Sequence, residues 1–182
     1  MLLMNADQQH IIQSNLTEMD IWDLMKQIYD PEIPVISIVD LGIVRAIEVK
    51  TLPNNSEPQA TITITPTYSG CPAMDVIGMN IRMKLLEHGF KNVALKTILS
   101  PAWTTDWMSN EGKEKLKAFG IAPPNPSHSV CEPAIFQEQE IVQCPNCNSF
   151  HTKMISRFGS TACKALYKCD DCSEPFDYFK CH

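Results

Sequence analysis

Cys144-Pro145-Asn146-Cys147 and Cys169-Asp170-Asp171-Cys172, near the end of the 182-residue chain, are the stretches that decide the fold. Two residues separate the cysteines of each pair, and about twenty residues separate the pairs, which is typical of four thiolates that hold one metal ion. Each short spacer lets the backbone turn so that both sulfurs reach the same ion. The sequence therefore predicts a C-terminal β zinc ribbon over residues 141–182, with these four cysteines as ligands.

Zinc is the expected structural metal of this ribbon, although four thiolates also accept iron and the spacing does not separate the two. A redox function is disfavoured, because a thioredoxin-type CxxC opens a helix after a strand of a βαβ unit and neither pair has that setting. A domain of this size has little hydrophobic core, so the bound metal should supply much of its stability.

Composition describes a globular protein, with 44% hydrophobic and 20% charged residues. The first residues lack the basic start and apolar core of a signal peptide, and no stretch approaches the ~18 apolar residues of a membrane span. We therefore expect a cytoplasmic protein without a membrane partner. In that reducing compartment its eight cysteines should be metal ligands or free thiols before they are disulfides.

The charge distribution argues against nucleic acid as a partner. Sixteen acidic and 10 basic residues precede residue 140, and five of each follow from Glu140 onward. A zinc ribbon that binds nucleic acid needs a basic surface to neutralise phosphates. This ribbon is neutral and the rest of the chain is acidic, so we expect no nucleic-acid binding.

Hydrophobic periodicity predicts a compact α+β domain over residues 17–120, with the order α-β-β-α-β-α. Polar residues 1–16 are interpreted as a loose N-terminus, and proline-rich residues 121–140 as an extended linker to the ribbon. The expected elements are a helix that Thr17 caps and Pro31 ends, strands at 39–50 and 60–67, a helix at 73–88, a strand at 93–99 and a short helix closed by Gly120.

Cys71 stands directly before Pro72, and proline is favoured at the first position of a helix. Cys71 should therefore be the N-cap or its neighbour, where free amide groups and the helix dipole favour a thiolate. Such a thiolate can bind a soft metal or attack an electrophile. The alternative is a buried, inert cysteine at a strand–helix junction. Asp30, Glu32 and Asp40 flank a rigid loop, and they either order it or join Cys71 at a metal.

Cys163, Cys181 and His182 are candidates for a second metal site in the ribbon or for thiols that exchange metal with the first. The alternative, which we favour, is a packed Cys163 and a free C-terminal thiol. No catalytic residue is assigned. The chain has no Glu-x-x-His di-iron pattern on its predicted helices, no glycine-rich nucleotide loop and no nucleophile–base pair, so we expect no enzymatic activity from it alone.

Three stretches resemble the MIP18 family, also called the domain-of-unknown-function-59 family, over roughly residues 17–100. They are Asp30-Pro-Glu-Ile-Pro-Val35, Val39-Asp-Leu-Gly-Ile-Val44 and Thr65-Pro-Thr-Tyr-Ser-Gly-Cys-Pro72. Members of this family are linked to iron–sulfur cluster assembly and insertion. The resemblance implies that Cys71 is the motif cysteine that transiently handles iron or a cluster, and that Asp30, Glu32, Asp40 and Gly42 match the family's acidic loop and turn.

Residues 100–108, 158–167 and 174–181, together with the two cysteine pairs, resemble the family of D subunits of bacterial phenylacetyl-CoA epoxidase systems. This resemblance implies a place in aerobic phenylacetate degradation, where a di-iron oxygenase receives electrons from an iron–sulfur flavin reductase. It implies an accessory protein that matures the cluster or the di-iron centre, with the oxygenase subunits or the reductase as partners. The alternative is a non-catalytic structural or regulatory subunit that docks these components through its ribbon.

Overall fold

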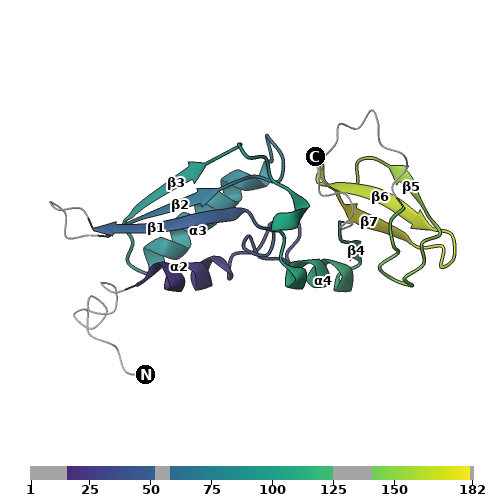
Figure 1. The fold of residues 1–182 in the computed structure, drawn as a ribbon, viewed down its shortest axis with the longest axis horizontal. Helices are drawn as coiled ribbons and strands as arrows, with labels where there is room; N and C mark the ends of the chain where they lie inside the picture. The colour runs from purple at the N-terminus through teal and green to yellow at the C-terminus, as the bar shows by residue number, and fades with distance from the viewer. Residues whose placement is uncertain (1–15, 52–57, 125–140, 181–182) are drawn as a thin grey trace, which may run out of the picture.

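The computed structural model describes residues 16–51, 58–124 and 141–180. Its strands form two sheets, one in each part of the chain (Figure 1). The N-terminal sheet has the order β1-β2-β3, and the ribbon sheet has the order β4-β7-β6-β5. The predicted combination of an α+β domain with a C-terminal β ribbon is confirmed. None of the helices in these ranges is long and apolar enough to cross a membrane.

Helix α2 (Glu18–Met25) begins at the predicted cap. Thr17 Oγ1 accepts a hydrogen bond from the Asp20 N–H, and the Asp20 carboxylate accepts one from the Thr17 N–H at 2.7 Å. This capping box satisfies two backbone donors that the helix leaves unpaired. The helix ends at Met25, so the prediction that Pro31 ends it is wrong. The α-helical pattern stops before Pro31, because the Ile28 N–H donates to the Met25 carbonyl, only three residues back.

The N-terminal sheet combines a hairpin with a crossover. Strand β1 (Val44–Thr51) pairs with β2 (Pro58–Ile64) in antiparallel fashion, and β2 pairs with β3 (Asn92–Thr97) in parallel. Helix α3 (Ala73–Glu87) makes the connection from β2 to β3 and lies against the sheet (Figure 1). A parallel pair requires such a crossover, since a short turn cannot return the chain to the same end.

The core of this domain lies between α3 and the sheet. Ala60, Ile62 and Ile64 alternate along β2 with exposures of 0–3%, as a half-buried strand predicts. The predicted apolar face of α3, formed by Ile77, Ile81 and Leu85, packs in the same cluster.

The strand predicted at residues 39–50 begins later than expected, at Val44. Residues 39–43 form a turn instead, in which the Gly42 N–H donates to the Val39 carbonyl and Gly42 has a φ of 70°. This left-handed conformation suits glycine. A side chain on Gly42 would also collide with the backbone of Trp107, in the short helix η1 (Thr105–Trp107).

Helix α4 (Asn110–Ala118) is fixed to the same turn through its cap. Ser109 Oγ accepts a hydrogen bond from the Gly112 N–H at 2.9 Å. The Ser109 N–H donates to the Asp40 carbonyl at 2.9 Å, and its hydroxyl donates to the Asp40 carboxylate at 2.8 Å. Gly112 lies against Asp40 with no room for a larger residue. These contacts therefore fix the position of α4, and the chain enters the ribbon sheet directly after this helix.

The ribbon consists of β5 (Thr152–Ser156), β6 (Lys164–Cys169) and β7 (Pro175–Phe179), close to the predicted strands. A fourth strand, β4 (Ile121–Ala122), pairs in parallel with β7. The first two residues of the predicted linker are therefore part of the ribbon sheet. Two residues are too few to show a periodicity, and this strand depends on a partner that lies far along the chain.

Contacts between apolar side chains join the ribbon to the N-terminal domain. Phe179 and Cys163 of the ribbon are 1% and 4% exposed and belong to the core cluster of the N-terminal domain. The rings of Trp103 and Phe179 meet edge to face with centroids 6.0 Å apart, and Trp103 Nε1 donates to the Leu41 carbonyl at 2.9 Å. The ribbon keeps a smaller core of its own, built around Tyr167, Phe176 and Tyr178.

Candidate metal centre

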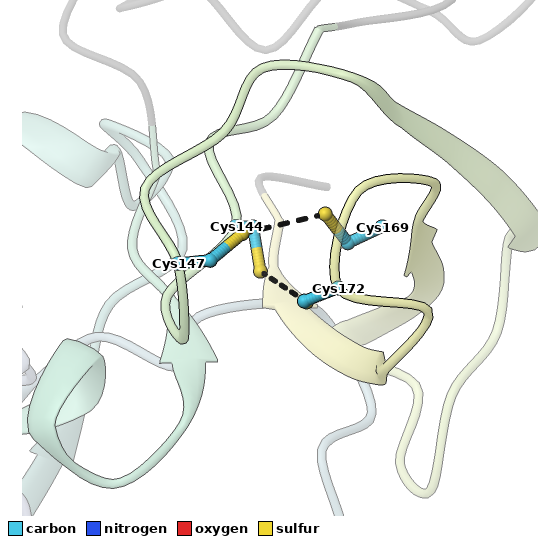
Figure 2. A group of neighbouring side chains, drawn as sticks. All are labelled: Cys144, Cys147, Cys169 and Cys172. Carbon is cyan, nitrogen blue, oxygen red and sulfur yellow. Dashed lines mark hydrogen bonds between the residues drawn. The ribbon is translucent and has the colours of Figure 1, made fainter.

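The four predicted ligands converge on one point (Figure 2). All four sulfur atoms lie within 4.8 Å of one another. Cys144 Sγ is 3.8 Å from Cys172 Sγ, and Cys147 Sγ is 3.5 Å from Cys169 Sγ. Sulfurs that bind one tetrahedral zinc at about 2.3 Å lie about 3.8 Å apart. The cysteines therefore fit a closed four-thiolate centre, and zinc is the metal that this ribbon would hold.

The two cysteine pairs are built by the same backbone pattern. The Cys144 N–H donates to the Ser149 carbonyl at 2.8 Å, and the Cys169 N–H donates to the Glu174 carbonyl at 3.0 Å. In each turn the residue after the second cysteine has a positive φ, 63° at Asn148 and 66° at Ser173. Neither position holds the glycine that would have signalled this conformation, so the sequence analysis missed it.

Backbone amides in these turns support the negative charge of the thiolates. Hydrogen bonds from the N–H groups of Cys172 and Asp171 lower the pKa of Cys169 to about 7. At Cys147 the N–H of Ser149 lowers the pKa, but burial and the three facing thiols outweigh it and raise the pKa to about 12. Four thiolates repel one another until a cation neutralises them, so metal binding should release protons.

Cys71 lies one residue before the N-cap of α3, which is Pro72. The Ala73 N–H lowers the pKa of the Cys71 thiol, as expected of a helix N-terminus, and so does a hydrogen bond with Tyr68. Burial is the larger effect, however, and the net pKa is raised. The expectation of a stabilised thiolate is therefore not met, because burial of the sulfur outweighs the helix N-terminus. Cys71 remains partly exposed, in contrast to the buried Cys163.

The three acidic candidates separate into two groups. Asp30 is 8% exposed, and its Oδ1 accepts hydrogen bonds from the N–H groups of Glu32 and Ile33 at 2.8 and 2.9 Å. Burial raises the pKa of Asp30. It therefore orders the loop that carries Glu32, which is the first of the two predicted roles.

Asp40 is committed to a structural contact. Its carboxylate accepts hydrogen bonds from Ser37, Ser109 and Lys115 at 2.8–2.9 Å. Burial raises its pKa, but these donors outweigh burial and lower it overall. Asp40 thus ties the loop to α4.

Cys163 is packed, as the favoured interpretation holds, but it also makes a polar contact. Its Sγ lies 3.6 Å from Glu32 Oε2 and 3.0 Å from Thr161 Oγ1. Burial raises the pKa of Cys163 to about 11, and the nearby charge of Glu32 adds to this effect. The contact joins residues 131 positions apart, and no signal in the sequence could have found it. Cys181 and His182 lie outside the described residues.

Two family models match this chain, one in each of its two parts. A family model described as "Iron-sulfur cluster assembly protein" matches residues 18–101. A second, described as "PaaD zinc beta ribbon domain", matches residues 129–180. A solved structure, the domain of unknown function DUF59 from Bacillus anthracis, is 27% identical with a TM-score of 0.47 and covers 62% of this chain and 97% of its own.

Two curated relatives extend the comparison. "Fe-S protein maturation auxiliary factor" of Porphyromonas gingivalis is 37% identical over 101 residues, which is 55% of this chain and 90% of that protein. The D subunit of the putative 1,2-phenylacetyl-CoA epoxidase of Escherichia coli is 50% identical over 162 residues, which is 89% of this chain and 92% of that protein. The chain therefore belongs to the family of 1,2-phenylacetyl-CoA epoxidase D subunits, in which an iron–sulfur cluster assembly domain precedes a zinc ribbon.

Proposed function

We propose that this protein matures the metal centres of a phenylacetyl-CoA epoxidase system, with iron or an iron–sulfur cluster as its cargo. The client is the reductase that carries an iron–sulfur cluster or the oxygenase that carries a di-iron centre. The observation that carries the proposal is the position of Cys71. It is a partly exposed thiol at the start of α3, on which the charges of Glu32 and Asp30 act, in the part of the chain that matches an iron–sulfur cluster assembly family.

The ribbon centre is suited to stability rather than to transfer. Its four thiolates fill the coordination sphere of one tetrahedral ion and leave no open position for a client ligand. Cys144 and Cys169 are fully buried. Zinc in this centre therefore holds the ribbon together, and the cargo is handled elsewhere.

Cys71 has the properties of a temporary ligand. Burial raises its pKa, so the free thiol is protonated near neutral pH. A soft metal replaces that proton when it binds, and the proton returns when the metal leaves. The helix N-terminus favours the charged sulfur in the loaded state. Release to a client with more thiolate or carboxylate ligands is then favourable.

The test is the iron content of the clients. The reductase and the oxygenase are each purified anaerobically from cells that also produce the wild type, Cys71→Ser or Ser69→Ala. Ser69 is an exposed residue of the same loop and provides the matched control. We expect Cys71→Ser to lower client iron to the level found without the protein, and Ser69→Ala to have no effect. Full client iron with Cys71→Ser would reject the proposal.

A second candidate function is a docking subunit that transfers no metal. It is favoured by four large apolar side chains that the ribbon exposes by 53–64%: Ile141, Phe150, Ile155 and Phe158. Such side chains are typical of a protein contact surface. This function predicts complexes with the epoxidase components that form equally well with wild type and Cys71→Ser, together with full client iron.

A further inference from the structure

The contact between Cys163 and Glu32 joins two parts of the molecule that carry different chemistry. Cys163 comes directly before β6 of the ribbon, and Glu32 belongs to the acidic loop of the assembly domain. Cys163 is 4% exposed and lies in the core cluster that both parts share. The contact therefore exists only when the ribbon is docked.

The distance in this contact is that of two ligands on one metal ion. A thiolate at about 2.3 Å and a carboxylate oxygen at about 2.0–2.2 Å from a tetrahedral ion lie about 3.6 Å apart. Cys163 Sγ and Glu32 Oε2 are 3.6 Å apart. A cation can thus bind between them without a large movement of either atom. Asp30 fixes the loop that presents Glu32, through its hydrogen bonds to the Glu32 and Ile33 N–H groups.

Cys71 and Tyr68 pack against the core cluster that contains Cys163, and Cys71 shares the electrostatic environment of that residue. After burial, the negative charges of Glu32 and Asp30 are among the causes that raise the pKa of both Cys71 and Cys163. Tyr68, which hydrogen-bonds to Cys71, is influenced by Glu32 and Cys163 as well. Two thiols whose ionised forms are disfavoured by the same carboxylate charges are a set that a cation would stabilise. The Lys164 ammonium pairs with Asp177 at 3.5 Å, and its charge lowers the pKa of Cys163 without outweighing burial and the carboxylates.

We propose that Cys71, Cys163 and Glu32 form one composite site, in which the ribbon and the assembly domain together hold a thiophilic divalent ion. The inference rests on the proposed function, because the ion held there is the cargo that Cys71 passes on. Two thiolates and one carboxylate suit a borderline ion such as Fe²⁺, Co²⁺ or Zn²⁺. Each thiol gives its proton to solvent as its metal–sulfur bond forms. The three ligands leave a fourth position free for a client group.

The composite site closes around its ion rather than standing preassembled. Among the described residues, the ribbon cysteines are the one group of three or more ligands whose atoms all lie close together. Cys71 must therefore move closer to the Cys163–Glu32 pair when the ion binds. Binding should therefore be weaker and faster to reverse than at the ribbon centre, as cargo requires.

Cobalt binding tests this site directly. Full-length protein with one zinc in the ribbon is titrated anaerobically with Co²⁺, and the thiolate-to-cobalt charge-transfer absorption is recorded. Zinc binds thiolates more tightly than cobalt does, so the ribbon retains its zinc. We expect one further cobalt with charge transfer from two thiolates. Cys163→Ser should halve the absorption per bound cobalt and weaken binding at least tenfold, on the order of the loss that even an outer-shell change causes.

Glu32→Gln serves as the second variant, because Cys163 is buried and its replacement has a larger effect on packing. It should leave the absorption per cobalt unchanged and weaken binding by about tenfold or more. Glu111→Gln is the control, since the side chain of Glu111 is 72% exposed and pairs with Lys115. Retained zinc in every variant shows that the ribbon is folded.

Three outcomes overturn the composite site: no cobalt beyond the zinc in the wild type, full absorption per cobalt in zinc-loaded Cys163→Ser, or wild-type affinity in Glu32→Gln. These outcomes are separable from failure of the proposed function. If client iron depends on Cys71 but Cys163→Ser retains full absorption per cobalt, only the composite site is rejected. If both thiols bind cobalt but client iron is the same with wild type and with Cys71→Ser, only the proposed function is rejected.

Discussion

The ribbon centre and the proposed composite site differ in how much of each the fold assembles before a metal binds. In the ribbon, four sulfurs from two backbone turns of the same design already lie within 4.8 Å of one another. At the junction of the two parts, Cys163 and Glu32 are at ligand distance, but Cys71 is held on a separate element. The difference teaches that local turns can preassemble a metal centre, whereas a site between domains depends on how the domains pack.

The largest expected effect is loss of the ribbon site. Cys144→Ser removes one of four thiolates from a centre of a type whose metal contributes about 10–16 kcal/mol of apparent binding free energy. We expect zinc to be lost and the ribbon to unfold while the N-terminal sheet stays folded. Elemental analysis and amide hydrogen exchange measure the two effects. Cys71→Ser should keep its zinc, and persistent amide protection in the ribbon of Cys144→Ser would contradict the prediction.

The next effect separates docking from ribbon folding. Phe179→Ala deletes a ring that is 1% exposed and meets Trp103 across the junction, at an expected cost of about 3–5 kcal/mol. The ribbon should retain its zinc, but the cobalt absorption at the composite site should disappear. Phe150→Ala, at an exposed position of the ribbon, is the matched control. Wild-type cobalt absorption in zinc-loaded Phe179→Ala would show that the second site does not depend on docking.

A smaller effect distinguishes the structural carboxylate from the one assigned to metal. Asp40→Asn should destabilise the protein by about 1–3 kcal/mol, because Lys115, Ser109 and Ser37 lose a charged acceptor. Cobalt binding should be unchanged, unlike in Glu32→Gln. Denaturant unfolding measures the first effect and cobalt titration the second. Weakened cobalt binding in Asp40→Asn would place this carboxylate at the metal after all.

The same variant has a pH signature. The pKa of Asp40 is lower in the folded protein than in the unfolded chain. Its contribution to stability is therefore complete above the unfolded pKa, about 3.9, and is lost as pH falls through the folded value. Unfolding free energies measured from pH 6 downward should fall less steeply below about pH 4 in Asp40→Asn than in the wild type. Parallel curves would contradict the assignment.

The smallest effect concerns the turns that build the ribbon site. Ser173 has a φ of 66°, which costs a residue with a side chain about 1–2 kcal/mol relative to glycine. Ser173→Gly should therefore raise the stability of the zinc-loaded ribbon by about 1 kcal/mol in thermal unfolding. Asn148→Gly should help less, because asparagine tolerates this conformation. If both variants change the stability equally, or if Asn148→Gly raises it more than Ser173→Gly does, something other than backbone strain limits the turns.

Much of the fold followed from local patterns. The Thr17 cap, the buried face of α3 and the three main ribbon strands each depend on residues close together in the chain, where periodicity and capping act. Apart from the end of α2, the errors occurred where distant partners decide the structure. The turn at residues 39–43 depends on packing against Trp107, and β4 depends on β7.

The assignments around Cys71 could be predicted only in part from local sequence patterns. Its place beside the N-cap of α3 follows from the proline after it, as predicted. The direction of its pKa does not, because burial outweighs the helix N-terminus and burial is set by neighbouring elements. Its metal-handling role, the client proteins, the cytoplasmic location and the full domain boundaries remain predictions.

The sequence by itself determined the ribbon centre, because two closely spaced cysteines and one backbone turn place a pair of sulfurs on one ion whatever surrounds them. It also determined the α+β domain, through periodicity and a specific set of motifs. Only the tertiary structure decided which of the remaining thiols and carboxylates meet. Cys163 and Glu32 are 131 residues apart, and they meet at the junction where the Phe179 and Trp103 rings also pack. Hydrophobic packing is non-directional, so the sequence does not show which distant residues it brings together. The contact between Cys163 and Glu32 could therefore be found only in the folded chain.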